Sequence, residues 1–532
     1  MEGNRSIIID EIAVNYNDES SVLEICNRNH IAIPQTCFTE HLTPSGHCGL
    51  CTIELFDESV PENWLPVLAC MLAPQDGMKI RTKSNVIATI REMAGQLILR
   101  SHPCDCEFCE KFDHCELRKI YNKTGFGFVR AIEDGKGKKP AISRLSQQFC
   151  LDREKCTNCG VCTTYCREKL GKDFLHNVLK FNGKTHLELY PGVAYEEGYL
   201  LNLIEICPYN AIMDEKTLGQ PPPWKLHALN GISMESSTGN NTKIFVQDNE
   251  IMYIKPRKNL HIGDVIPDIA RDLHRNNNAN RVDTLILHGQ KGEERETILF
   301  FLSKIGFGHR CAMVCNGSLP LESMLLARQL ADVLGAQIFV KNYRQDGDDW
   351  LISKDKNTNI RSALLTQVIK KNTVEDFSEV EELITRRQIQ TIIVLNEDVL
   401  SMGLSKGSFA TIDSITFSCH KNETTQNSHA VFPICSVFEE DGHFINKDFL
   451  LQRSHRAIIR KTEAKPLWQW LAMIKNIYTG KSQEEAEFQS IESIWTSMEK
   501  SLPEFKGLKF SEIPPEGIFL ENNRFKNFPF VA

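Results

Sequence analysis

The stretch HPCDCEFCEKFDHCELR, residues 102–118, holds four cysteines and two histidines within fourteen residues. Thiolates and imidazoles at this density indicate a metal site, because soft and borderline metals select these ligands. Three of the thiols lie on one short loop with the spacing Cys106-x2-Cys109-x5-Cys115. A [4Fe–4S] cluster takes four ligands, one for each iron, so this loop is one ligand short.

The fourth ligand is predicted to be His102. The other candidates, Cys104 and His114, lie within two residues of a cysteine already in the set, which leaves too little chain to reach another corner of the cube. The segment 83–103 has apolar residues at helical spacing, and Pro103 should end that helix just after His102. A neutral imidazole in place of a thiolate should raise the reduction potential. The alternative is that His102 only caps the helix carbonyls.

A second group has the spacing Cys37-x10-Cys48-x2-Cys51-x18-Cys70. Three cysteines on one loop with a distant fourth are typical of a [2Fe–2S] ferredoxin site, although the first gap is longer than in plant-type ferredoxins. Gly46 and Gly49 lie on either side of Cys48, where glycine allows the backbone to approach a cluster closely. Zinc held by the same four cysteines is the alternative.

A third group has the spacing Cys156-x2-Cys159-x2-Cys162-x3-Cys166, and Cys207-Pro208 follows later in the chain. The run is that of bacterial ferredoxins, in which the fourth cysteine of a run serves a second cluster. Only one complete run is present here. We therefore predict that Cys207 completes the [4Fe–4S] site and that Cys166 is free, with Cys166 in place of Cys207 as the alternative.

The cysteines are concentrated in one part of the chain, with fifteen of the nineteen within residues 1–207. Paired C-x2-C spacings in a reducing compartment favour metal sites over disulfides. The net charge of −8 argues against a nucleic-acid partner. The sequence shows neither an apolar run of about 20 residues nor a secretory signal. We therefore expect a cytoplasmic chain without membrane insertion.

The rest of the chain alternates short apolar strands with amphipathic helices after PPPW at 221–224. This alternation predicts α/β units with a parallel sheet. The expected strands are 283–289, 311–317, 336–341 and 390–398, and the expected helices 296–306 and 321–335. The late cysteines are expected to be small core residues. They are Cys311, Cys315, Cys419 and Cys435.

The order of the three groups resembles the large iron–sulfur subunit of NADH:quinone oxidoreductase, or respiratory complex I. The resemblance is strongest over residues 1–215. It rests on Cys37, Cys48, Cys51 and Cys70; His102, Cys106, Cys109 and Cys115; and Cys156, Cys159, Cys162 and Cys207. The later segments 429–446 and 491–513 look like parts of molybdopterin oxidoreductases.

The resemblance implies a multidomain α+β and α/β fold. The expected domains are a β-grasp [2Fe–2S] ferredoxin-like domain (1–82), a [4Fe–4S] domain with one histidine and three cysteine ligands (83–148), a ferredoxin-like [4Fe–4S] domain (149–220) and a molybdopterin-oxidoreductase-like α/β region without active cofactor (221–532). It also implies electron transfer from the flavin of a neighbouring subunit toward quinone. Partners would be the other peripheral-arm subunits, including the flavin- and NADH-binding one, on the cytoplasmic side of the inner membrane. No substrate site and no catalytic residue are expected in this chain itself.

The sequence departs from working molybdoenzymes where these often carry C-x2-C-x3-C for a further cluster. Asn230, Ser233 and Ser237 have that spacing without a thiol, so we expect one [2Fe–2S] and two [4Fe–4S] clusters and no molybdenum. Two other functions stay open. One is the equivalent subunit of an NAD-linked hydrogenase or formate dehydrogenase, and the other is a zinc-stabilised scaffold without a redox role.

Overall fold

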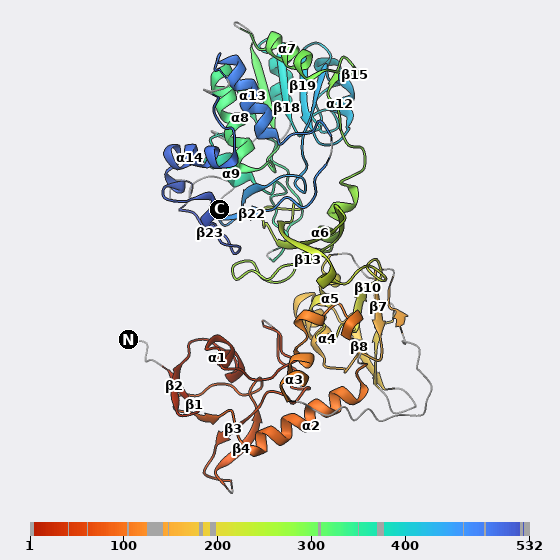
Figure 1. The fold of residues 1–532 in the computed structure, drawn as a ribbon, viewed down its shortest axis with the longest axis vertical. Coiled ribbons are helices and arrows are strands. Elements are labelled where there is room, and N and C mark those ends of the chain that lie inside the picture. The colour runs from red at the N-terminus through yellow and green to blue at the C-terminus, as the bar shows by residue number, and fades with distance from the viewer. Residues whose placement is uncertain are drawn as a thin grey trace. The chain divides into compact units, whose positions relative to one another are not determined.

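The structure is a computed structural model that describes residues 5–40, 42–60, 62–103, 106–124, 142–146, 148–179, 185–191, 198–306, 310–348, 350–369, 377–460, 462–482, 486–521 and 525. The chain divides into two compact units, Met1–Lys225 and Leu226–Ala532 (Figure 1). All three predicted cluster groups belong to the first unit. Each unit is described by itself.

The first unit begins with a mixed sheet in the strand order β2-β1-β5-β3-β4. The strands are β1 (Ser6–Ile9), β2 (Ile12–Asn15), β3 (Thr52–Phe56), β4 (Trp64–Leu68) and β5 (Lys79–Arg81). β1 pairs antiparallel with β2 and parallel with β5. Helix α1 (Val22–Arg28) begins at Ser21, whose hydroxyl accepts a hydrogen bond from the Glu24 N–H, and its apolar residues join the core beneath the sheet. The predicted ferredoxin-like fold is confirmed.

Helix α2 (Asn85–Ser101) brings His102 to the second cysteine group. It begins at Ser84, whose hydroxyl accepts a hydrogen bond from Ile87 N–H at 3.0 Å, and ends where the His102 N–H donates to Ile98 O at 3.2 Å. Short elements follow: η1 (Cys106–Phe108), η2 (Phe112–His114) and α3 (Glu116–Thr124). The prediction that a helix ends at His102 is confirmed.

The rest of the first unit surrounds the third cysteine group. One sheet has the order β10-β7-β6, with β6 (Ile142–Arg144), β7 (Phe149–Asp152) and β10 (Ile212–Asp214), and a hairpin joins β8 (Leu175–Leu179) to β9 (Thr185–Leu189). Helix α4 (Val161–Lys169) follows Gly160, whose φ of 82° is left-handed backbone that suits glycine. The elements η3 (Leu200–Asn202) and α5 (Leu203–Ile206) end at Cys207.

The second unit is built on a seven-stranded sheet in the order β15-β14-β20-β19-β18-β16-β17. The strands are β14 (Ile286–Leu287), β15 (Gln290–Lys291), β16 (Cys311–Cys315), β17 (Gln337–Phe339), β18 (Thr391–Leu395), β19 (Asp413–Ser418) and β20 (Ala430–Pro433). The five strands from β16 to β20 pair in parallel, as predicted. The predicted strand 283–289 is wrong in extent and direction. The chain turns at His288 and Gly289, both with positive φ, so β14 is two residues long and antiparallel to β20.

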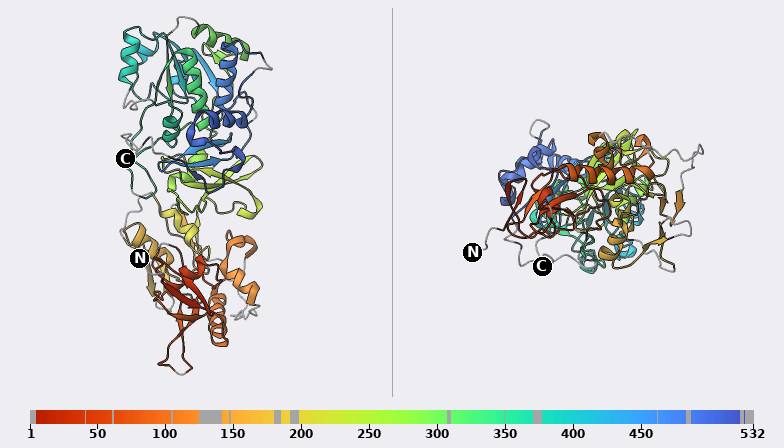
Figure 2. Two further views of the ribbon diagram at one scale, coloured as in Figure 1. Left: turned by 90° about the vertical axis from the view of Figure 1, so that its left-hand side faces the viewer. Right: turned by 90° about the horizontal axis from the view of Figure 1, so that it is seen from below.

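Helices cover both faces of this sheet (Figure 2). Met313, Ile393 and Ile415 pack on one face against α7 (Glu294–Lys304), α8 (Leu321–Leu334) and α13 (Leu467–Tyr478). Val314 and Ile392 point to the other face, which α10 (Ser378–Thr385) and α11 (Lys406–Phe409) cover. Residues that alternate in the strands thus fill two separate cores.

Shorter elements complete this unit. The strands are β11 (His227–Ile232), β12 (Asn241–Gln247) and β13 (Glu250–Pro256) in one sheet, and β21 (Gly442–Ile445), β22 (Leu450–Ser454) and β23 (Ile518–Phe519) in another. The helices are α6 (Asp268–Asp272), η5 (Leu273–Asn276), α9 (Ile360–Leu365), α12 (Glu423–Asn427), α14 (Ile491–Ser501), η6 (Pro503–Phe505) and η7 (Phe510–Glu512), whereas η4 (Pro223–Lys225) ends the first unit. Within the described ranges, no helix has the length and apolar character that a bilayer span requires.

Candidate metal centres

The first cysteine group is brought together as two close pairs. The Cys48 N–H donates to the Cys37 Sγ at 3.4 Å, and the Cys51 and Cys70 sulfur atoms lie 3.4 Å apart. A hydrogen bond from the neighbouring Cys37 thiol lowers the pKa of Cys48 to about 5. Two buried thiol pairs match a binuclear site in which each iron takes two protein ligands.

The two glycines beside Cys48 are explained by backbone conformation. Gly46 and Gly49 both have a φ of 68°, the left-handed region that other residues rarely adopt. A Cβ at Gly49 would also lie 3.3 Å from the Ala94 Cβ on α2. The loop therefore needs glycine to bend around Cys48 and to pack against the helix that follows.

The second group lines one small cavity. Its walls include His102, Cys106, Cys109 and Cys115. Backbone hydrogen bonds wind the loop tightly, from Cys109 N–H to Cys106 O at 3.1 Å and from Phe112 N–H to Cys109 O at 3.0 Å. The Arg118 N–H donates to the Cys115 Sγ at 3.4 Å. The structure thus brings the four predicted ligands to one place, whereas Cys104 lies outside the described residues.

The third group lines a separate cavity. Its walls include Cys156, Cys159, Cys162 and Cys207. The Ala211 N–H donates to the Cys207 Sγ at 3.3 Å. Cys166 lies on α4, is fully buried and does not line this cavity. Burial raises the pKa of its thiol to about 12. This geometry favours Cys207 over Cys166 as the fourth ligand.

The loops of the first and third groups are in direct contact. Ser45 Oγ donates to Cys159 O at 2.7 Å, and the Thr43 N–H donates to the Glu168 carboxylate at 3.0 Å. Side chains from both groups also share an apolar core with Val161. No spacing in the sequence indicates these contacts, because they join residues that lie far apart in the chain.

The donor sets fit iron–sulfur clusters. Each group combines buried or half-buried thiols with backbone N–H groups directed at sulfur, which is how proteins hold and tune such clusters. The ligands of such a cluster are spread over several iron atoms, one for each iron of a [4Fe–4S] cluster. Across the described ranges, no three histidine, cysteine, aspartate or glutamate side chains converge closely enough to share a single metal ion.

The second unit has a cavity of about 600 Å³ at the carboxyl ends of its parallel strands. Cys311, Cys315 and Cys419 are core residues, as predicted, whereas Cys435 is only half-buried. Cys419 and Cys435 both line this cavity. Their sulfurs are hydrogen-bonded, Cys419 Sγ to Asn396 Oδ1 at 3.4 Å and Cys435 Sγ to Ala464 O at 3.9 Å. The two cysteines follow β19 and β20, at the carboxyl ends of parallel strands, where sheets of this kind form a crevice for ligands.

The positions that would hold a further cluster in molybdoenzymes take part in local polar contacts. Ser237 Oγ donates to Ser353 Oγ at 3.0 Å, Ser233 bonds to Glu235, and the His455 N–H donates to Asn230 O at 2.9 Å. The absence of a cluster here stays a prediction, as does the absence of molybdenum.

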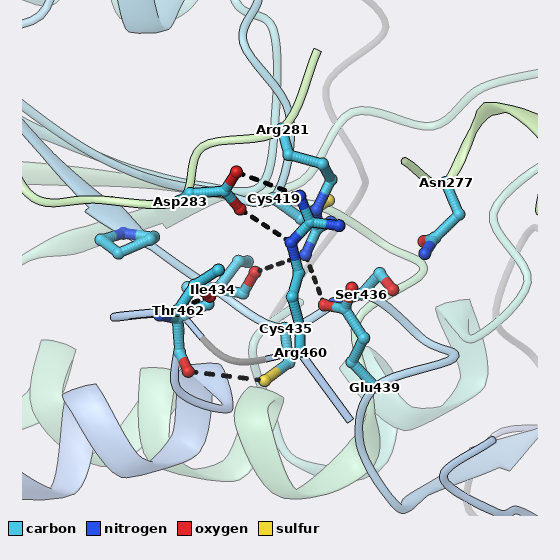
Figure 3. A network of polar contacts seen from close by, with 12 residues as sticks. Asn277, Arg281, Asp283, Cys419, Ile434, Cys435, Ser436, Glu439, Arg460 and Thr462 are labelled. Atoms are coloured by element: carbon cyan, nitrogen blue, oxygen red, sulfur yellow. Dashed lines mark hydrogen bonds and ion pairs between the residues drawn. The ribbon is translucent and has the colours of Figure 1, made fainter. Parts of the chain in front are cut away.

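A buried ion pair lies near this cavity (Figure 3). The side chains of Arg281 and Glu439 are each 1% exposed and bonded to each other. Arg281→Met leaves the Glu439 carboxylate buried without its cation, so we expect a loss of about 3–5 kcal/mol in the free energy of unfolding. Denaturant titration of the variant measures this loss, and Arg281→Met with Glu439→Leu should recover most of it.

The neighbouring pair of Arg460 and Asp283 is a matched control (Figure 3). Asp283 has a side chain that is 41% exposed, so Arg460→Met should cost only about 0–1 kcal/mol. Equal losses for the two arginine variants would contradict the difference that burial predicts.

The fold and the three candidate sites resemble a class of protein in which iron–sulfur domains precede a molybdopterin-oxidoreductase-like region. Family models match in the same order. They are a 2Fe-2S iron-sulfur cluster binding domain at residues 5–85, the NADH-ubiquinone oxidoreductase-G iron-sulfur binding region at 91–130 and a molybdopterin oxidoreductase at 274–477. The predicted fold class is thereby confirmed.

Individual relatives confirm the resemblance to the large iron–sulfur subunit of NADH:quinone oxidoreductase. The chain is 25% identical to the NADH-ubiquinone oxidoreductase 75 kDa subunit of Reclinomonas americana, over 62% of this chain and 48% of that one. It is 24% identical to the mitochondrial NADH dehydrogenase [ubiquinone] iron-sulfur protein 1 of Solanum tuberosum, over 54% of this chain and 38% of that one. The aligned part thus spans half or less of the length of these relatives.

A solved structure of an NAD+-reducing [NiFe]-hydrogenase in the H2-reduced state also aligns with the chain. It shares 20% identity over 42% of this chain and 92% of that one, with a TM-score of 0.34. A score this low does not support a shared fold.

Proposed function

We propose that this chain is an iron–sulfur electron-transfer subunit of an NADH:quinone oxidoreductase. It would pass electrons from the flavin of a neighbouring subunit toward quinone. The observation that carries the proposal is the convergence of the predicted ligands into three groups within one compact unit. The relatives that are subunits of this enzyme support it.

The residues of each group would hold one cluster. Cys37, Cys48, Cys51 and Cys70 would hold [2Fe–2S]; His102, Cys106, Cys109 and Cys115 the first [4Fe–4S]; and Cys156, Cys159, Cys162 and Cys207 the second. When bound, such clusters accept and release single electrons. The protein's part is to keep the ligands buried and aligned by backbone hydrogen bonds, which limits rearrangement when the charge changes.

Partners and location belong to the same proposal. The chain would assemble with other peripheral-arm subunits, including the flavin- and NADH-binding one, on the cytoplasmic side of the inner membrane. The four domains, 1–82, 83–148, 149–220 and 221–532, are likewise proposed units of this subunit.

Metal analysis of the chain, isolated without oxygen, tests the function. We expect about ten iron atoms per chain, two from the [2Fe–2S] cluster and four from each [4Fe–4S] cluster, and electron paramagnetic resonance signals from three reducible clusters. Stoichiometric zinc in place of iron would contradict electron transfer. About fourteen iron atoms would show a further cluster. Molybdenum would favour a formate-dehydrogenase-like subunit.

A further inference from the structure

Tyr209 belongs to the walls of both [4Fe–4S] cavities. It follows the ligand Cys207 and Pro208 in the chain and is 3% exposed. Tyr209 lines the cavity of the third group and also that of the His102 group. One aromatic residue thus lies between two candidate clusters whose cysteine loops are separate in the sequence.

The ring and the hydroxyl of Tyr209 have different neighbours. The ring packs beside the His102 imidazole, with centroids 5.8 Å apart and planes tilted by 54°. The hydroxyl lies 2.6 Å from Thr36 Oγ1, in a buried hydrogen bond that either group can donate. Thr36 precedes Cys37, so this contact reaches the [2Fe–2S] loop.

These contacts join the three candidate sites. Tyr209 belongs to the walls of both [4Fe–4S] cavities, and its hydroxyl is hydrogen-bonded to the residue that precedes the first ligand of the [2Fe–2S] group.

We propose that Tyr209 is a positioning residue shared by the three cluster sites: its ring keeps the space between His102 and Cys207 dry, and its hydroxyl holds the Thr36–Cys37 segment in place. This inference rests on the proposed function, since it requires clusters at these ligands. It adds a residue that is not a ligand and that no cysteine spacing indicates.

The ring and the hydroxyl should affect different clusters. Reduction adds negative charge, and water stabilises that charge, so water admitted where the ring was should favour the reduced state of the [4Fe–4S] clusters. Loss of the hydroxyl leaves the ring in place but breaks the bond to Thr36. That change should act on the [2Fe–2S] cluster through Cys37.

The test is a redox titration of the full chain, followed by electron paramagnetic resonance, with iron counted in every variant. We expect Tyr209→Ala to shift the redox equilibrium of both [4Fe–4S] clusters toward reduction by about threefold or more. Tyr209→Phe should leave them within about twofold of the wild type. Tyr253→Phe, a buried tyrosine of the second unit, is the control and should shift none.

The hydroxyl contact is tested by a double-mutant cycle. Tyr209→Phe and Thr36→Val should each shift the [2Fe–2S] equilibrium by about two- to tenfold, in the same direction. Because both remove the same hydrogen bond, the double variant should shift it no further than the larger single change. Additive shifts, or no shift, would overturn the proposal.

The iron count separates failure of this inference from failure of the function. Tyr209→Ala with about ten iron atoms and unmoved [4Fe–4S] equilibria would overturn the inference alone. If Tyr209→Ala loses iron, the inference depends on the milder variant. Tyr209→Phe must then keep about ten iron atoms and shift the [2Fe–2S] equilibrium in the same direction as Thr36→Val. A wild-type chain without iron would overturn both proposals.

Discussion

Cys207→Ala should reduce the iron content from about ten to about six atoms per chain, because the third site loses one of four thiolates and its [4Fe–4S] cluster. The side chain is buried and lines the same cavity as the Cys156–Cys162 loop. The signals of the other two clusters should remain. Iron analysis and electron paramagnetic resonance of the reduced chain measure both effects.

Cys166→Ala is the matched control for this change. Cys166 is also buried and lies on α4, four residues after Cys162, but it does not line the cavity. We expect the Cys166→Ala variant to keep about ten iron atoms, with at most a small loss in the free energy of unfolding. If Cys166→Ala loses iron and Cys207→Ala does not, Cys166 is the ligand and the proposed set is wrong.

The local part of each site could be predicted from the sequence because the spacing of cysteines on one loop limits which ligands can converge. The helix that ends at His102 was also predictable, since its apolar periodicity and Pro103 are local signals. Cys207 was predicted as the fourth ligand because only one complete cysteine run is present. How it reaches the Cys156–Cys162 loop, at the end of α5, is seen only in the fold.

The failures have physical reasons too. The segment 283–289 reads as a strand by composition, but left-handed residues at His288 and Gly289 turn it back on itself. The hydrogen bond between Thr36 and Tyr209 joins residues 173 positions apart, and neither residue type is a usual cluster ligand. Contacts of this kind follow only from the tertiary fold.

His102→Ala should also lose about four iron atoms, because the second site would keep only three of its four proposed ligands. His102→Cys should instead keep about ten, with a lower potential for that cluster, since an anionic thiolate replaces a neutral imidazole. We expect a decrease of roughly 100 mV or more, given that two histidines raise Rieske centres by ~250 mV or more. A redox titration of the variant measures the decrease.

The same pair of variants tests whether His102 is only a helix cap. In that case His102→Ala would keep its iron and cost roughly 0.3–1 kcal/mol of stability. His114→Ala is the control, because His114 belongs to the same loop and is not in the proposed set. If His114→Ala loses iron and His102→Ala does not, His114 is the fourth ligand, since each of the four irons needs one protein ligand.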